Sequence, residues 1–289
     1  MSSTTVTRAV SQPVQLKVDN VADKSSEKNK LINELWVIPE FTDKYEERQW
    51  AKEHMAGAFR VFAKLGFNDG AGGHISLRDP VQTDCFWINP YPVHFGLVKA
   101  SDLILVNEDG DALVETQYKV NRAGFMIHAA LHKARPDVHA ACHMHTPHGR
   151  AWSVFGKPIE MLCQDSCYFY NDLSIYEGFG GVVLAREEGE RIAEALGPKN
   201  MSVILQNHGL LTCGGTVDEA AGRFIALERA CQTQLLAEAA AANGIRKTYI
   251  GEEEAMYTKE GAGTAAVLFT QFKPEYDMIL KETNGDFLD

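Results

Sequence analysis

The chain has 289 residues, of which 45% are hydrophobic and 23% charged. These proportions are typical of a soluble globular protein and exclude a mostly disordered or fibrous chain. The formal net charge is −11, and no cluster of lysine and arginine forms a basic stripe, which argues against a nucleic-acid partner.

The sequence shows no feature of a membrane or secreted protein. It has no uninterrupted apolar run of about 18 residues, and residues 1–20 lack the apolar region of a signal peptide. We therefore expect a cytoplasmic protein with no membrane partner. Six cysteines are scattered through apolar surroundings, as reduced and buried thiols usually are, so we expect no disulfide bonds.

The first third of the chain begins with polar residues and continues with helix and strand patterns. Residues 1–30 show no periodicity, which predicts a mobile or extended arm, or one that orders against a neighbouring subunit. Apolar residues at helical spacing predict an amphipathic helix over residues 42–66. Strands are predicted over residues 74–78 and 85–90, and over residues 102–115 around a turn.

Helices and strands alternate in the rest of the chain. Helices are predicted over residues 121–135, 186–197 and 217–244, and strands over residues 138–146 and 201–209. This interleaving predicts an α/β protein with a single core.

The expected organisation is one domain with two flanking segments. We expect residues 31–247 to form the domain. Residues 248–289 carry more aromatic side chains than a disordered segment usually does. This tail is therefore expected to dock on the domain or to lie at a subunit contact.

Three of the ten histidines stand where a metal site can form. In a strand, His143 and His145 project from the same face, about 6.6 Å apart along the strand. His208 stands at the end of a separate apolar strand and can supply a third imidazole. A bare His-x-His pair also occurs as hydrogen-bonded core residues, and the third histidine favours the metal interpretation.

Three neutral imidazoles leave one position of a tetrahedral ion open to water or substrate, as in catalytic zinc sites. Such an ion acts as a Lewis acid toward a substrate oxygen. Zinc is the expected metal, although imidazole also binds iron, and Mn²⁺ or Co²⁺ are further alternatives.

Other motifs carry less chemistry. His128 and His132 are spaced as in a metalloprotease HExxH motif, but the segment reads HAALH without the required glutamate, so we interpret them as packing residues or as residues that support the ligands from behind. The Gly-rich turn at residues 72–76 suits either an anion or a simple turn, and it lacks the Walker and Rossmann patterns. No GxSxG elbow supports a serine hydrolase.

Taken together, the motifs resemble the class II aldolase and adducin head-domain family over about residues 45–240. The resemblance rests on GAGGHISLRD, WINPYPVHFGLVKASDLILVNEDG, HAALHKARPDVHAACHMHTPHGRA and ILQNHGLLTCGGTVDEA. It implies a three-layer α/β/α sandwich around a mainly antiparallel sheet, and commonly a homotetramer with sites at subunit interfaces. It also implies that His143, His145 and His208 bind the metal.

The sequence departs from the family at two places. The family usually has a PSSE-like segment four residues before the histidine that matches His128, whereas here Gly124 stands at the glutamate position within VNRAGFMIH. The usual Gly-Asn of the other phosphate loop is replaced by Gly73 and His74. We therefore expect a non-phosphorylated substrate, with Lys99 and Arg122 as candidate anion contacts beside these two residues.

Without the family glutamate, another residue must transfer protons. The candidates are His74 and, in the polar segment QDSCYFYND, Asp165, Tyr168 and Tyr170. Family members often present this segment near the site of a neighbouring subunit.

Three functions fit these observations. The first is a metal-dependent lyase that cleaves or decarboxylates a small carbonyl or carboxylate substrate through an enediolate. The second is a metal-dependent oxygenase acting on aromatic hydroxy acids. The third is a non-enzymatic interaction domain, as in adducin, against which the retention of all three histidines argues.

Overall fold

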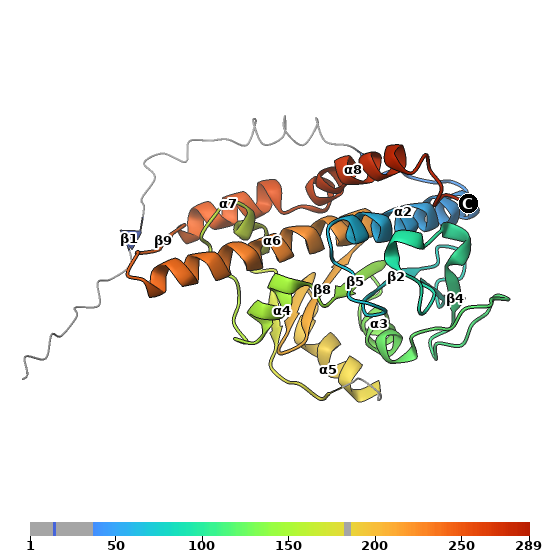
Figure 1. Ribbon diagram of the computed structural model, residues 1–289, viewed down its shortest axis with the longest axis horizontal. Coiled ribbons are helices and arrows are strands. Elements are labelled where there is room, and N and C mark those ends of the chain that lie inside the picture. Colours follow the sequence, from blue (N-terminus) through green and yellow to red (C-terminus); the bar gives the residue numbers. More distant parts are fainter. Residues whose placement is uncertain (1–13, 16–36, 182–185) are drawn as a thin grey trace, which may run out of the picture.

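The computed structural model describes residues 14–15, 37–181 and 186–289 (Figure 1). Apart from two residues, the predicted arm over residues 1–30 lies outside the described residues. The two described residues form β1 (Val14–Gln15), which pairs in parallel with β9 (Thr248–Tyr249).

A seven-stranded sheet forms the centre of the molecule, with the strand order β4-β3-β2-β5-β8-β7-β6. All neighbouring strands are antiparallel except β6 and β7, which run parallel. The strands are β2 (His74–Arg78), β3 (Phe86–Ile88), β4 (Ile104–Val106), β5 (Ala140–Met144), β6 (Ser174–Tyr176), β7 (Ser202–Leu205) and β8 (Gly209–Gly214).

Helices cover both faces of this sheet (Figure 1). On one face lie α2 (Lys44–Lys64), α6 (Val217–Ala242) and α8 (Ala265–Glu282), and on the other α3 (Arg122–Ala134) and α5 (Arg186–Leu196). Two further helices, α4 (Pro147–Ser153) and α7 (Glu252–Ala262), flank these layers. The expected three-layer α/β/α architecture around a mainly antiparallel sheet is therefore confirmed.

The alternation of side chains along β5 sends them into hydrophobic clusters on opposite faces of the sheet. Cys142 packs into the cluster beneath α2, α6 and α8, whereas Ala141 packs into the cluster beneath α3 and α5. His143 follows the same alternation as Ala141, so its ring lies on the α3 and α5 face. The strand pattern thus places the first candidate ligand, His143, on the face of the sheet that α3 and α5 cover.

Local signals explain several element boundaries. The side chain of Asp43 accepts a hydrogen bond from the backbone N–H of Tyr45 and begins α2, and Gly66 follows its end in the left-handed conformation. Thr216 caps α6 in the same way by accepting from the N–H of Glu219. These boundaries agree with the predicted helices to within a few residues.

Two predicted strands end earlier than expected. The strand over residues 138–146 ends at Met144, so His145 lies one residue beyond β5. The strand over residues 201–209 ends at Leu205, and His208 lies in the turn of a β7–β8 hairpin. Asn207 takes the left-handed conformation in this turn, with φ of 57°, which asparagine tolerates better than most residues.

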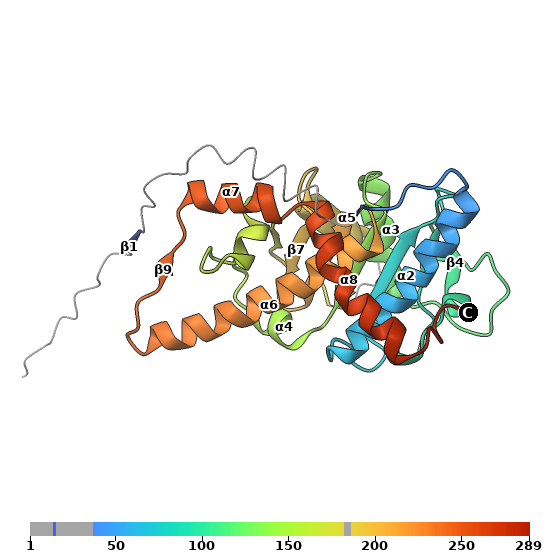
Figure 2. The same cartoon turned by 90° about the horizontal axis from the view of Figure 1, so that it is seen from above.

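Residues 248–289 fold back onto the domain as β9, α7 and α8, and Figure 2 shows α8 lying across α6 and α2. Phe272 of α8 is fully buried in the core that α2 and α6 share.

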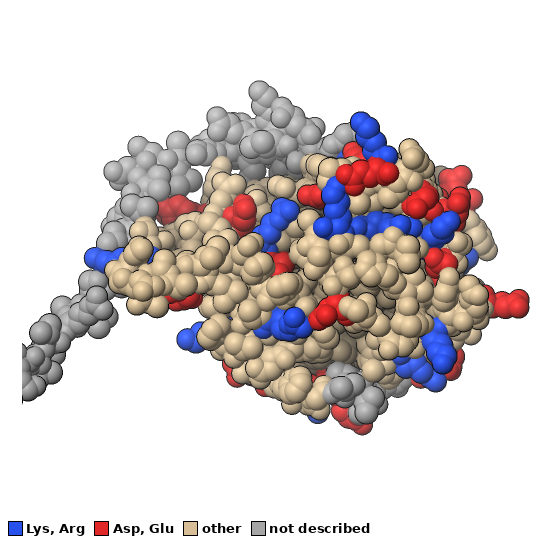
Figure 3. Space-filling model, in the orientation of Figure 1, with Lys and Arg blue, Asp and Glu red and all other residues tan. Residues whose placement is uncertain are grey.

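All six cysteines are free. None of the helices in the described part of the chain is long and apolar enough to cross a membrane. On the face seen in Figure 3, acidic and basic side chains are interspersed.

Candidate metal centre

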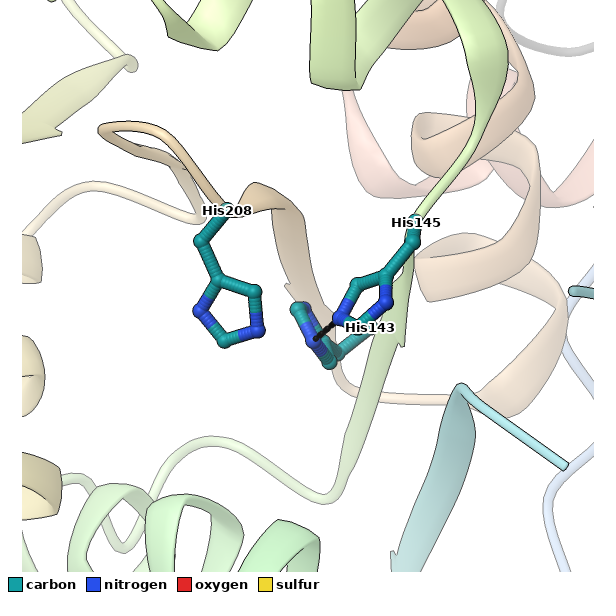
Figure 4. A group of neighbouring side chains, drawn as sticks. All are labelled: His143, His145 and His208. Carbon is teal, nitrogen blue, oxygen red and sulfur yellow. Dashed lines mark hydrogen bonds between the residues drawn. The ribbon is translucent and has the colours of Figure 1, made fainter. Parts of the chain in front are cut away.

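Three histidines converge at one end of the sheet (Figure 4). His143 lies near the end of β5, His145 is the residue just beyond this strand, and His208 lies in the β7–β8 turn. One ring nitrogen from each residue lies within 4.8 Å of the other two. Since β5 and β8 pair in register, with His143 opposite Leu211, the sheet itself fixes the spacing of the two segments.

Hydrogen bonding fixes which nitrogen His143 presents. Its Nδ1 lies 2.9 Å from the carbonyl oxygen of Leu210, which can only accept, so Nδ1 carries the hydrogen. Its Nε2 therefore faces the cluster and lies 3.2 Å from Nε2 of His145. Two nitrogens on one tetrahedral zinc ion, each about 2.0–2.1 Å from the metal, are about 3.3 Å apart. The observed spacing fits two ligands of a single ion.

The protein holds all three imidazoles in the form that binds metals. Burial lowers the pKa of His143 well below its ordinary value, and it lowers the pKa of His145 as well. Burial and the neighbouring His145 lower the pKa of His208 to about 4. All three rings are therefore neutral at pH 7 and each offers a lone pair, as a metal ligand must.

A cavity of about 380 Å³ opens beside these rings. It is lined by residues of the Gly-rich turn, α3, the segment from β5 into α4, the loop after β6 and the β7–β8 turn: Gly72, Gly73, His74, Asn121, Ala123, Gly124, Ile127, His143, His145, Arg150, Phe179, Gly181, Asn207 and His208. Two of the predicted site residues besides the ligands, Gly73 and His74, are among them.

The predicted cationic contacts lie elsewhere in this chain. The Lys99 ammonium is 3.8 Å from the carboxylate of Asp289, and Arg122 donates to the carboxylate of Asp111 at 2.7 Å. Neither is among the described residues that line the histidine cavity. Each side chain instead pairs with a carboxylate that does not line the cavity.

The predicted residues Asp165 and Tyr168 lie at a second place. Asp165 begins a 3-10 helix (Asp165–Phe169), and both residues line a separate cavity of about 120 Å³ between α6 and α8. Within one chain they do not meet the three histidines. A role for them at the site of a neighbouring subunit stays a prediction.

Sequence reasoning missed three polar residues that line the histidine cavity: Asn121, Arg150 and Asn207. Arg150 is the single lysine or arginine among the described lining residues, and its guanidinium lies 2.9 Å from the carboxylate of Asp69. Its position five residues after His145, within one turn of a helix that begins at Pro147, was the signal that could have revealed it.

A buried carboxylate holds the segment that follows His145. Glu228 of α6 is 2% exposed and accepts hydrogen bonds from the hydroxyl of Thr146 and from the backbone N–H groups of His148 and Gly149. Nδ1 of His148 lies 2.9 Å from the same carboxylate. The negative charge thus sits at the N-terminus of α4, where free N–H groups favour it, and fixes the path of the chain leaving the site.

A second group of histidines lies deeper, between β2 and α3. Ser76 Oγ lies 2.6 Å from Nδ1 of His128 and 2.7 Å from Nε2 of His132, and Nδ1 of His132 lies 3.0 Å from the carbonyl oxygen of Val138. The expectation that His128 and His132 are packing residues therefore agrees with their full burial and internal hydrogen bonds.

The burial of His132 predicts a loss of stability in acid. Burial, together with the nearby Arg78, lowers the pKa of His132 to about 3, whereas an unfolded histidine has a pKa near 6.5. Below pH 6.5 the unfolded chain therefore binds a proton that the folded chain excludes. We expect this group to lower the free energy of unfolding by up to about 1.4 kcal/mol per pH unit between pH 6.5 and pH 3.

Urea unfolding at pH 7, 6 and 5 measures this effect. The variant His132→Gln does not titrate in this range. Its free energy of unfolding should therefore fall less steeply with decreasing pH than that of the parent protein. Equal slopes in the two proteins would contradict the assignment.

Comparison with known proteins agrees with this geometry. A family model described as Class II Aldolase and Adducin N-terminal domain matches residues 53–235. Decarboxylase NovR of Streptomyces niveus is 41% identical over 84% of this chain and 88% of that protein. The 4-hydroxy-3-prenylphenylpyruvate oxygenase/4-hydroxy-3-prenylbenzoate synthase of Streptomyces roseochromogenus subsp. oscitans is 40% identical over 84% of this chain and 86% of that protein.

A solved structure shows the same architecture. The L-fuculose 1-phosphate aldolase from Glaciozyma antarctica PI12 superimposes with a TM-score of 0.79 at 40% identity, covering 89% of this chain and 98% of that one. The matched residues 53–235 include all three converging histidines, the Gly-rich turn and the start of α3. The chain is therefore a member of the class II aldolase and adducin N-terminal domain family.

Proposed function

We propose that this protein is a metal-dependent lyase that breaks a carbon–carbon bond next to a carbonyl or carboxylate group of a small substrate, by retro-aldol cleavage or decarboxylation. The convergence of three neutral imidazoles at the wall of a cavity is the observation that carries this proposal. His143, His145 and His208 would hold a divalent ion, with Zn²⁺ first and Fe²⁺, Mn²⁺ or Co²⁺ as alternatives. When bound, the ion supplies a Lewis acid for the substrate oxygens.

The chain's own residues determine how a substrate is held. The cavity keeps the reacting group beside the imidazoles, and the backbone of the Gly-rich turn closes it on one side. Arg150 at the rim is 53% exposed, and its positive charge suits a carboxylate that displaces or joins Asp69.

We further propose that the substrate carries no phosphate. A phosphate dianion usually needs several cationic or N–H donors, whereas Arg150, already paired with Asp69, is the one cationic side chain among the described lining residues. The names of two relatives support a carboxylate, since one is a decarboxylase and the other acts on a phenylpyruvate. The name of the solved relative points instead to a phosphate ester, so the two substrate types need direct comparison.

The test is a comparison of three compounds with the zinc-loaded protein. We expect cleavage or decarboxylation of 4-hydroxy-3-prenylphenylpyruvate or L-fuculose to exceed cleavage of L-fuculose 1-phosphate, measured by mass spectrometry of the products. Faster turnover of the phosphate ester would contradict the non-phosphorylated substrate. Turnover of none of them, by a protein that binds no metal, would favour an adducin-like interaction domain.

An oxygenase is the second candidate, because a 40% identical relative is named as one and three imidazoles also suit iron. An oxygen electrode separates the two. Consumption of oxygen by the iron-loaded protein with 4-hydroxy-3-prenylphenylpyruvate would favour the oxygenase, whereas anaerobic turnover by the zinc-loaded protein would favour the lyase.

We also propose a homotetramer, which the family commonly forms and in which Asp165 and Tyr168 would approach a neighbouring site. Light scattering after size-exclusion chromatography measures the assembly directly. A monomer would leave both residues without a role in the reaction.

A further inference from the structure

Of the three converging histidines, only His143 lies within a paired strand. The pairing of β5 with β8 ends where Met144 lies opposite Leu210, and His145 is the next residue along the chain. His208 lies in the turn between β7 and β8. The positions of His145 and His208 therefore depend on contacts outside the sheet.

Glu228 of α6 holds the residues that follow His145 with both of its carboxylate oxygens. Its Oε2 accepts from the hydroxyl of Thr146 at 2.5 Å and from the backbone N–H of Gly149 at 2.6 Å. Its Oε1 accepts from the backbone N–H of His148 at 2.9 Å. The ring of His148 also contacts Oε1, but this ring is 38% exposed, so water can replace it. The two backbone bonds and the buried hydroxyl thus form the main restraint.

The helix α4 extends this restraint to other residues of the site. It begins two residues after His145 and contains Arg150, which lines the histidine cavity. At its end, the carbonyl oxygen of Ser153 accepts from the backbone N–H of Asn207 at 3.3 Å. Asn207 directly precedes His208 in the β7–β8 turn. A shift of α4 would therefore displace residues on both sides of the cavity.

We propose that Glu228 is a positioning residue of the metal centre, which acts through α4 to keep His145 and His208 at the separation that one ion requires. The inference rests on the proposed function, because it concerns how well these rings bind a metal. Glu228 is not among the described residues that line the cavity, and its printed hydrogen bonds involve none of the three converging histidines. It therefore acts through the backbone and not by touching a ligand.

An amide cannot replace this carboxylate. Each oxygen of Glu228 accepts from a different backbone N–H, that of His148 or that of Gly149. In the variant Glu228→Gln, one of these oxygens becomes an NH₂ group, which can only donate. In either orientation of the amide, a donor then faces a backbone N–H at hydrogen-bonding distance. We expect the start of α4 to move away from α6 as a result.

Zinc affinity, measured by competition with a chelator, tests the proposal. We expect Glu228→Gln to bind zinc about tenfold more weakly than the parent protein, in the lower range of losses seen when groups that orient metal ligands are removed. The Co²⁺-loaded variant should also show weaker visible absorption, because distortion away from tetrahedral coordination weakens these bands. Thr146→Val removes one donor to Glu228 and leaves the carboxylate in place, so we expect a loss of about threefold.

Glu219→Gln is the matched control. Glu219 lies on the same helix, is 3% exposed and accepts from the backbone N–H of Gly215 at 2.8 Å, but it does not line the histidine cavity. We expect Glu219→Gln and Glu228→Gln both to lower the Tm, whereas only the second should lower zinc affinity. This difference separates positioning of the ligands from a general contribution to stability.

The outcomes also separate this inference from the proposed function. If Glu228→Gln and Thr146→Val bind zinc as tightly as the parent protein, the role of Glu228 is overturned and the metal site stands. An equal loss of affinity in Glu219→Gln would overturn it as well. If Glu228→Gln does not fold, the comparison of Thr146→Val with Glu219→Gln decides. A parent protein that binds no zinc would contradict the proposed function, and the inference would fail with it.

Discussion

Replacing His145 with alanine is expected to remove most of the bound metal. The substitution leaves two imidazoles. Even the loss of a residue that only hydrogen-bonds to a metal ligand usually lowers metal affinity about 10- to 100-fold. We therefore expect zinc affinity to fall by more than about a hundredfold. His145 suits this test because it lies just beyond β5 and is partly exposed, so its loss leaves the core intact.

Elemental analysis of metal per chain, followed by competition with a chelator, measures the effect. His148→Ala is the matched control, because this neighbouring histidine is bonded to Glu228 and is not part of the converging group. Equal metal content in the parent protein and in His145→Ala would mean that the ligands are misassigned.

The largest loss of stability is expected from Asp172→Asn. The Asp172 carboxylate is buried and lies 2.7 Å from the guanidinium of Arg223, which is 3% exposed. It also accepts from Lys259 of α7 and, at 2.6 Å, from the backbone N–H of Met201. Neutralising it leaves the buried Arg223 with Glu219 as its remaining carboxylate and the half-buried Lys259 without its own, so we expect the free energy of unfolding to fall by about 3 kcal/mol.

Asp137→Asn is the control for this prediction. Asp137 also pairs with an arginine, Arg135, at 2.7 Å, but its side chain is 57% exposed. Solvent screens such a pair, so its loss should change stability by less than about 1 kcal/mol. Urea unfolding of both variants gives the comparison, and similar losses in the two would show that burial of the Asp172 pair adds nothing.

The convergence of the three histidines was predictable because local patterns carry it. Alternation along β5 placed His143 and His145 on one side, and the apolar run before His208 indicated where a third imidazole emerges. His208 lies in the turn between β7 and β8 and not at the end of a strand as predicted, but it is at the same end of the sheet. Such features depend on a few consecutive residues, which a sequence displays directly.

The environment of the site depends on contacts between distant segments. The pairing of β2 with β5 places His74 opposite His143, and the approach of α3 places Gly124 against the same ring. Departures at both positions were visible in the sequence, but nothing in it showed that they compensate each other. Lys99 and Arg122 failed to reach the cavity for the same reason, because their ion pairs are formed with partners that only folding brings near.

The tail illustrates a different limit. Its aromatic residues indicated packing, but α8 contains Pro274, which normally argues against a helix interior. The burial of Phe272 and Ile279 against α2 and α6 offsets that preference. Tertiary packing thus determined an element that local propensity disfavours.

The position of β5 has a consequence for how the proposed metal site would be filled. This strand lies inside the sheet with hydrogen-bonded neighbours on both sides, so His143 moves only if two strand pairings open. His143 is consequently held in place without an ion, unlike the ligands of domains that fold only around zinc. Under the proposed function, ions would exchange in the native state, and occupancy would follow the supply of free metal and not the history of folding.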